Sequence, residues 1–259
     1  MANRDPATTL LLDRFVREVS SLLSPVAIWA HGSLGGGDYQ PGRSDIDLIA
    51  VLDGNCSAEQ SKALTALHRR LLEELPLAAK LHCSYLVQSE GADVRAEHLT
   101  WAHRELFHRT VTPVTRRELH VFGVVLHGPP PAGLLPPVTD DALTAFLIDE
   151  MRGPWREALA NPELWRRDGW VDFGMLALAR ASVTLRSGRL ITKAEALDVL
   201  VDEWNAPAEV VDDIRARRYA DPTPATPEWI DRRARLTIAF LQDALADLPT
   251  PQGGVDATT

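Results

Sequence analysis

The sequence predicts an α+β protein, in which an N-terminal α/β domain with a mixed sheet is followed by a C-terminal all-helical bundle domain. Two observations carry this prediction. Short apolar runs typical of strands alternate with helical periodicity in the first half, whereas the second half is helical almost throughout. Between the halves, residues 128–137 hold five of the 18 prolines, as a linker would. We therefore expect domains over residues 1–127 and 138–248, and a disordered tail over 249–259.

The first domain is expected to begin with a helix over residues 8–23, where apolar residues recur at helical spacing and which Pro25 ends. A second helix is indicated by Ser57 as its N-cap and Glu59 in its first turn. Residues 110–127 predict a turn, a short helix and a strand or extended segment. That second helix is expected over 57–75. The other elements, in chain order, are a strand over 26–32, a glycine-rich loop over 32–44, a strand over 45–53 and a strand over 80–88.

The second half of the chain has few strand signals and repeats apolar residues at helical spacing. The predicted helices cover residues 139–160, 171–187, 192–204, 207–218 and 227–247. Its basic residues are arginines, except for Lys193, which follows "SGRLIT" at a predicted helix start. This lysine is therefore a candidate for a special role, although a solvated residue of a first helical turn is the simpler interpretation.

Composition and charge argue against several classes of protein. Hydrophobic residues make up 45% of the 259, which is ordinary for a folded chain and too high for a disordered one. No apolar run approaches the roughly 18 residues of a membrane helix, and the N-terminal segment lacks a signal-peptide pattern, so a cytoplasmic protein without membrane contact is expected. The net charge of −9 disfavours a nucleic-acid partner, which requires a basic face. Cys56 and Cys83 lack metal-ligand or redox spacing.

The segment "HGSLGGGDYQPGRSDIDLI" carries the strongest chemical pattern. Asp45 and Asp47 are two residues apart in a predicted strand, so both side chains project from the same face. Two ionised carboxylates so close repel each other unless a divalent cation lies between them, and Mg²⁺ prefers such oxygen ligands. Upstream, Gly32 allows close approach of a phosphate, and Ser33 and Ser44 are candidate donors to phosphate oxygens. Two exposed aspartates that cap a turn are the alternative.

The combination of these features resembles the nucleotidyltransferase superfamily, typified by polymerase β and by antibiotic nucleotidyltransferases. An apolar strand is followed by Gly32 and Ser33, then by eleven residues, then by an Asp-apolar-Asp-apolar motif at Asp45 and Asp47. The resemblance implies transfer of a nucleotide with the help of Mg²⁺, which offsets charge on the phosphates. It also implies a third group that accepts the proton of the attacking hydroxyl.

The second half resembles the C-terminal helical domain of the aminoglycoside adenylyltransferases that act on streptomycin and spectinomycin, over residues 171–197. In that family an arginine and a lysine reach the phosphates of ATP, and the matching positions here are Arg180 and Lys193. A family tyrosine near the nucleotide falls on Tyr219. For Arg180 a buried salt bridge, and for Tyr219 an ordinary packing role, are the alternatives. The resemblance implies an antibiotic-resistance enzyme with ATP and Mg²⁺ in a cleft between the domains.

The sequence departs from the family at the third carboxylate, a glutamate early on the strand after the Asp-x-Asp motif. His82 occupies the matching position, and Ser84 lies on the same face by alternation. Either His82 is the base, a role that suits an imidazole near neutral pH, or the site binds nucleotide and transfers it slowly or not at all. Glu90 and Asp93, just beyond the strand, are weaker candidates, and a half-buried structural histidine is the simplest interpretation of His82.

The acceptor side departs from the family pattern as well. Family members bind cationic aminoglycosides through acids and an aromatic side chain near the first helix of this region, but the family acids fall nearer Arg166 and Trp170 here. Asp168, Trp170 and Asp172 supply similar residue types and are the candidates for binding a cationic acceptor, with cation–π contact from the tryptophan. A helix start anchored by tryptophans is the competing interpretation.

The sequence thus predicts a nucleotidyltransferase that moves AMP from ATP to a hydroxyl of a small, cationic acceptor such as an aminoglycoside. We expect ATP and that acceptor as its partners, and a monomer. Two alternatives remain open: a nucleotide-binding protein of the same fold with weak or no catalysis, and a nucleotidyltransferase that modifies a protein or another metabolite. A nucleic-acid polymerase is disfavoured by the acidic chain.

Overall fold

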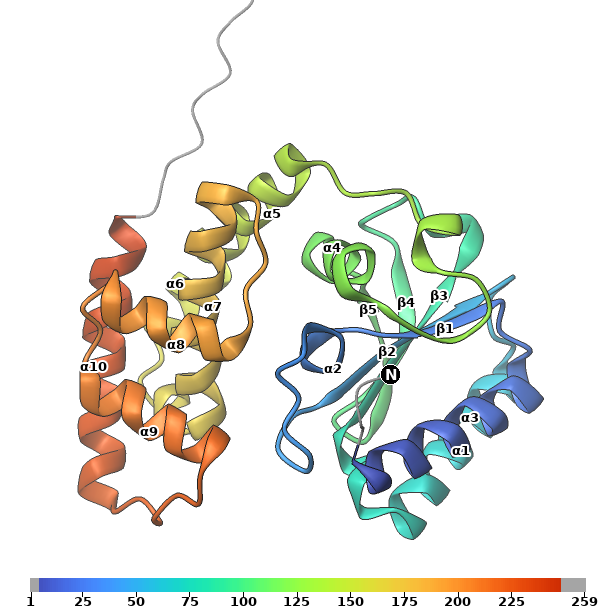
Figure 1. Cartoon of the computed structure of the whole chain (residues 1–259), viewed down its shortest axis with the longest axis horizontal. Helices are drawn as coiled ribbons and strands as arrows, with labels where there is room; N and C mark the ends of the chain where they lie inside the picture. The colour runs from blue at the N-terminus through green and yellow to red at the C-terminus, as the bar shows by residue number, and fades with distance from the viewer. Residues whose placement is uncertain (1–4, 248–259) are drawn as a thin grey trace, which may run out of the picture. The chain divides into compact units, whose positions relative to one another are not determined.

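The computed structural model describes residues 5–247, which divide into two compact units with the boundary between Val138 and Thr139 (Figure 1). Within these residues the first unit contains one six-stranded sheet of strand order β5-β4-β3-β2-β1-β6. Its strands are β1 Ala27–Ala30, β2 Ile46–Leu52, β3 Leu81–Val87, β4 Glu97–Ala102, β5 Glu105–Thr110 and β6 Val124–His127. β2 and β3 pair in parallel and the other neighbours pair antiparallel, which confirms the predicted mixed sheet.

Helices cover both faces of this sheet. The helices α1 (Pro6–Leu23) and α3 (Ala58–Glu74) lie on one face, and α4 (Pro113–Phe122) lies on the other (Figure 1). Each face of the sheet carries its own hydrophobic core, and alternate residues of β2 contribute to one or the other. Leu48 and the other even-numbered residues pack with α1 and α3, whereas Ile49 and Val51 pack with Leu119 of α4. By this alternation Asp47, at an odd position, belongs to the α4 face.

Local sequence explains where the helices begin. Ser57 accepts the N–H of Gln60 while the Gln60 side chain accepts the N–H of Ser57, so the predicted N-cap of α3 is a complete capping box. At α1 the carboxylate of Asp5 accepts the N–H of Thr8, and the helix ends at Ser24, whose φ of 48° is left-handed. Part of the predicted glycine-rich loop is in fact a five-residue helix, α2 (Gly32–Gly36).

The hairpin of β4 and β5 was missed by the sequence prediction. Its two-residue turn consists of His103 and Arg104, whose φ angles are 53° and 68°. Tight hairpin turns of this kind normally carry Asn or Gly, because those residues tolerate positive φ. The turn therefore gave no recognisable signal, and its position became clear only in the structure.

The predicted linker 128–137 is not a free connection, because it packs onto the first unit. Leu135 is buried with the cluster on the α4 face, and the indole N–H of Trp29 donates to the carbonyl of Pro129 at 2.7 Å. Arg117 of α4 donates to the carbonyl of Val138 at 2.8 Å. Proline richness here reflects an ordered segment rather than a spacer.

The second unit is helical, as expected, although one boundary was wrong. The predicted helix over 139–160 is interrupted at Gly153 and Pro154, since proline has no N–H to continue the helical hydrogen bonds. The helices are α5 Asp140–Arg152, α6 Pro154–Leu159, α7 Asp168–Ser187, α8 Lys193–Asp202, α9 Ala208–Tyr219 and α10 Pro227–Ala246. The tail predicted for 249–259 lies outside the described residues. Within residues 5–247, no helix has both the length and the apolar character that crossing a membrane requires.

Candidate active site

The paired aspartates lie where β2 begins. Asp45 immediately precedes the strand and Asp47 is its second residue, with the fully buried Ile46 between them. The side chains of Asp45 and Asp47 retain 46% and 30% exposure, so both carboxylates reach solvent on the α4 face of the sheet. We call Asp45 and Asp47 the carboxylate pair, and their role in holding a metal ion stays a prediction.

Two basic side chains, one on β3 and one directly before it, face the carboxylate pair. The parallel register pairs Asp47 with His82, and Nδ1 of His82 lies 3.6 Å from Oδ1 of Asp47. One step earlier, Nζ of Lys80 lies 3.6 Å from Oδ1 of Asp45. The predicted proximity of His82 to the site is therefore present in the structure, whereas Lys80 was missed because a lysine before a strand carries no distinctive pattern.

The glycine-serine segment lies directly against Asp47. The N–H of His31 donates to the carbonyl of Asp47 at 3.0 Å. Gly32 has a φ of +59°, and a Cβ at this position would come within 2.6 Å of Oδ2 of Asp47. Only glycine fits there, because any side chain would strain the backbone and also strike the carboxylate. The fold thus brings Gly32 against Asp47, while the phosphate-binding roles of Gly32 and Ser33 stay predictions.

A buried histidine and glutamate join this segment to α4. Nδ1 of His31 lies 2.9 Å from Oε2 of Glu118, and both side chains are nearly excluded from solvent. Nearby, a Cβ on Gly35 would come within 2.5 Å of the carbonyl oxygen of Phe122, so α4 packs closely against α2. Sequence reasoning missed Glu118, because it lies 87 residues from His31 and no local pattern links the two.

Ser44 closes the turn that leads into the carboxylate pair. Its hydroxyl accepts the N–H of Gln40 at 3.0 Å, and its own N–H donates to the carbonyl of Gln40 at 2.9 Å. The residue is 2% exposed. These contacts explain how Ser44 positions Asp45, while its role toward a nucleotide stays a prediction.

His82 packs against a second histidine. The ring of His103, from the turn between β4 and β5, lies edge-on to that of His82 with 5.2 Å between the ring centres. Ser84, the other polar residue on this face of β3, accepts a hydrogen bond from the hydroxyl of Thr100 at 2.9 Å. Glu90 lies 3.8 Å from His98, which leaves His82 as the candidate proton acceptor closest to Asp47.

The carboxylate pair has the chemistry of an incomplete magnesium site. Asp45 and Asp47 are hard oxygen ligands on one face, and Gly32 keeps the space beside Asp47 clear of side chains. Among residues 5–247, no group of three His, Cys, Asp or Glu side chains could hold a metal ion by itself. Because Mg²⁺ usually completes its shell with water and substrate phosphates, two carboxylates fit a metal that arrives with a nucleotide.

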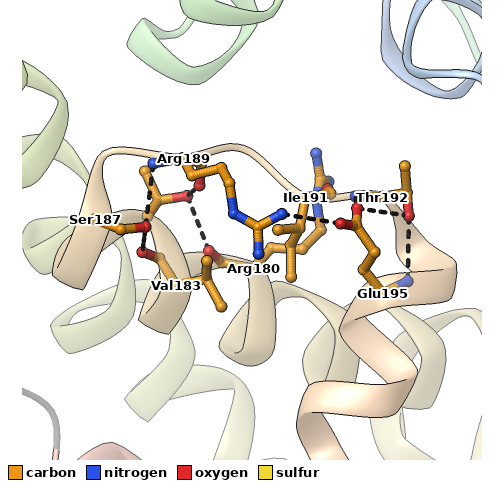
Figure 2. Close-up of polar contacts among 8 residues, drawn as sticks. Arg180, Val183, Ser187, Arg189, Ile191, Thr192 and Glu195 are labelled. Atoms are coloured by element: carbon orange, nitrogen blue, oxygen red, sulfur yellow. Dashed lines mark hydrogen bonds and ion pairs between the residues drawn. The ribbon is translucent and has the colours of Figure 1, made fainter.

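In the second unit, the predicted phosphate ligands gather at the start of α8. Nε of Arg180, from α7, donates to the carbonyl of Ile191 at 3.1 Å, two residues before Lys193 begins α8 (Figure 2). The helix start is fixed by a capping box between Thr192 and Glu195. The fold therefore brings Arg180 and Lys193 to the same end of α8, while their role toward ATP phosphates stays a prediction.

Tyr219, the predicted nucleotide neighbour, is the last residue of α9. The guanidinium carbon of Arg218 lies 5.5 Å from the centre of its ring, and Nε of Arg218 donates to its hydroxyl at 3.1 Å. A cation–π contact therefore holds this ring at the end of the helix. Its role toward ATP stays a prediction.

The predicted acceptor ligands take part in an ionic cluster inside the second unit. Oδ1 of Asp168 lies 2.5 Å from Arg233, a fully buried arginine, and Asp172 pairs with Arg217. Burial raises the pKa of Asp172, although Arg217 acts in the opposite direction. Asp213 binds both arginines. The two acids thus already neutralise internal arginines, which the sequence prediction did not anticipate.

Trp170 packs in an aromatic cluster beside these acids. Its ring centre lies 6.1 Å from that of Trp165 and 6.5 Å from that of Phe173. Trp165 is fully buried and fits there because Gly174 has no side chain: a Cβ would come within 2.6 Å of its ring. Anchoring of α7 accounts for Trp170, and an acceptor-binding role for Asp168, Trp170 and Asp172 stays a prediction.

Comparison with known proteins agrees with this geometry. Residues 12–94 match the family model of the nucleotidyltransferase domain, and this range includes Gly32, the carboxylate pair and His82. The chain is similar in structure to the spectinomycin adenyltransferase AAD(9) from Enterococcus faecialis, solved with ATP and spectinomycin. The TM-score is 0.67 at 13% sequence identity, and the match covers 90% of this chain and 99% of that chain. No protein of curated function matches the sequence.

These findings confirm the predicted superfamily and fold class. The family match lies in the unit that carries the carboxylate pair, and the structural match extends over both units. The N-terminal unit of this chain therefore contains a segment that matches the nucleotidyltransferase domain, and the chain has a fold similar to that of the spectinomycin adenyltransferase.

Proposed function

We propose that this protein is an adenylyltransferase that moves AMP from ATP to a hydroxyl of a small, cationic molecule such as an aminoglycoside. The observation that carries the proposal is the carboxylate pair beside Gly32, with His82 at 3.6 Å from Asp47. The nucleotidyltransferase match and the ATP in the similar crystal structure support ATP as the co-substrate.

On the nucleotide side, Asp45 and Asp47 would hold Mg²⁺ together with phosphate oxygens. When bound there, the ion offsets negative charge on the phosphates during displacement. Gly32 lets the phosphates approach the backbone, and Ser33 donates hydrogen bonds to them. By the family resemblance, Arg180 and Lys193 of the second unit are the candidates there for binding phosphate oxygens of ATP.

The transfer step requires a proton acceptor. The acceptor hydroxyl oxygen forms a bond to the α-phosphorus while the bond to pyrophosphate breaks, and the hydroxyl proton passes to an imidazole nitrogen of His82. Asp47, next to His82, stabilises the imidazolium that forms. The ring of His103 lies edge-on against that of His82.

A cationic acceptor suits the charge of the chain. The net charge is −9, which favours encounter with positively charged small molecules. Asp168 retains 57% exposure despite its contact with Arg233, so it is the better placed of the two predicted acids to contact an amino group. Trp170 would offer its ring face to the same cation.

The experiment that tests this proposal measures pyrophosphate release from ATP and Mg²⁺ with a panel of aminoglycosides that includes spectinomycin and streptomycin. We expect release with at least one acceptor, and a loss of about 100-fold or more in Asp47→Ala, the size of effect seen when a charge-stabilising group is removed. Asp53→Ala, an exposed aspartate just after β2, is the matched control and should retain activity. Release that Asp47→Ala does not reduce would contradict the proposal.

A second candidate is a nucleotide-binding protein with little or no turnover, and one observation favours it. The family's third carboxylate is replaced by His82, so the usual proton acceptor is absent. Calorimetry separates the candidates, because tight ATP binding without pyrophosphate release on any acceptor favours this alternative. Asp168 and Asp172 form ion pairs with arginines, which favours a third candidate, transfer of AMP to a different acceptor. Mass spectrometry of a cell extract incubated with labelled ATP would reveal that acceptor.

A further inference from the structure

The carboxylate pair faces two basic side chains, Lys80 directly before β3 and His82 on β3. The register of β2 and β3 pairs Ile46 with Leu81 and Asp47 with His82. Lys80 and His82 project on the same side as the pair, and each lies 3.6 Å from its own carboxylate. The β3 side of the site therefore carries basic groups where the family has an acid.

This arrangement limits how many divalent cations the site can hold. A second Mg²⁺ needs further hard oxygen ligands, and within residues 5–247 no third acid joins the pair to form a metal-binding group. The ammonium of Lys80 already offsets one of the two negative charges. A second divalent ion beside Lys80 would also meet like charge at short range, where Coulomb repulsion is strong.

We infer that the site takes one divalent cation for each bound nucleotide, and that Lys80 supplies the positive charge that a second metal ion supplies in two-metal sites. The inference rests on the proposed nucleotide-binding function and makes its metal requirement specific. The side chain of Lys80 is 37% exposed and flexible, so its ammonium can turn from Asp45 toward a phosphate oxygen.

Counting bound Mn²⁺ tests the inference without relying on activity. The protein is saturated with an ATP analogue whose α,β bridge is a methylene group, Mn²⁺ is titrated in, and free Mn²⁺ is measured by electron paramagnetic resonance. We expect one bound Mn²⁺ per bound nucleotide in the wild type. Two bound Mn²⁺ per nucleotide would overturn the inference, and no variant is needed for that decision.

Variants then test the role of the two basic residues. The double variant Lys80→Met with His82→Glu removes the ammonium and restores the acid, and it should bind a second Mn²⁺. Lys62→Met, an exposed lysine on α3, is the matched control and should bind one. A double variant that binds nucleotide but still takes only one Mn²⁺ would overturn the assignment to Lys80 and His82.

Nucleotide binding, measured by calorimetry on the same samples, distinguishes failure of the proposed function from failure of the one-metal inference. Failure of the wild type to bind the analogue with Mn²⁺ would overturn the proposed function and this inference together. Binding of the analogue with two Mn²⁺ would leave the proposed function standing and overturn the inference alone.

Discussion

At the scale of single residues, His82 is the candidate proton acceptor of the proposed reaction. It lies 3.6 Å from Asp47 on the strand where the family has a glutamate. A side chain that accepts a proton contributes about 10²- to 10⁴-fold to a reaction of this kind. The imidazole can supply that effect only if it is the group that receives the proton.

Replacement of His82 tests this role directly. We expect His82→Gln to lower kcat by about 100-fold or more, because an amide cannot accept the proton. We expect His82→Glu to retain kcat within about tenfold of the wild type, because a carboxylate can. Steady-state kinetics of both variants gives the answer, and a His82→Gln enzyme with unchanged kcat would show that another group is the base.

Glu118 is the second residue whose role follows from the structure alone. Its carboxylate holds His31, which precedes the glycine-serine segment and donates its N–H to the carbonyl of Asp47. We expect Glu118→Ala to raise the KM for ATP by about tenfold, equivalent to about 1.4 kcal/mol, with a smaller effect on kcat. Glu118→Gln keeps an acceptor for His31 and should remain near the wild type. Equal KM values in Glu118→Ala and the wild type would contradict a positioning role.

At the scale of secondary-structure elements, α3 is fixed to the sheet by a buried histidine. Nε2 of His68 lies 2.7 Å from the hydroxyl of Tyr85 on β3, and the ring stacks on Trp101 of β4 with 4.4 Å between centres. Burial lowers the pKa of His68 to about 3 from its ordinary value of 6.5. The imidazole therefore stays neutral in the folded protein, where its hydrogen bond joins helix to sheet.

This shift makes the stability of the fold depend on pH. Below pH 6.5 the unfolded chain binds a proton at His68 and the folded chain does not, so the free energy of unfolding falls as the pH falls. Between pH 7 and pH 5 we expect His68 to account for a loss of about 2 kcal/mol. Denaturant unfolding at both pH values should show a smaller loss of unfolding free energy in His68→Gln than in the wild type. In His108→Gln, which alters an exposed histidine, the loss should equal that of the wild type. Equal losses in His68→Gln and the wild type would contradict the account.

The same scale shows what the sequence could predict and why the rest was hidden. Apolar periodicity and the Ser57 cap located the helices and central strands, because these signals are local. The β4–β5 hairpin was missed because His103 and Arg104 adopt positive φ without glycine. In the site, Asp45, Asp47 and Gly32 were predicted from one motif. Lys80 and Glu118 were not, because strand register and helix packing bring them there from other parts of the chain.

At the scale of the whole molecule, the two units carry different parts of the proposed chemistry. The first unit holds the carboxylate pair, the glycine-serine segment and His82, and the second holds Arg180 and Lys193 at one end of α8. The structural match to AAD(9) covers both units. The proposed transfer of AMP assigns the metal and the proton acceptor to the first unit, and candidate phosphate-binding side chains to the second.

The most direct test of the central claim is mass spectrometry of the acceptors after incubation with the complete protein, ATP and Mg²⁺. The account predicts that at least one cationic acceptor gains the mass of an adenylyl group with the wild type and with Asp53→Ala, and that Asp47→Ala gives no such product. If no acceptor in the panel gains this group while the protein is folded and binds ATP, transfer to a small cationic molecule is contradicted.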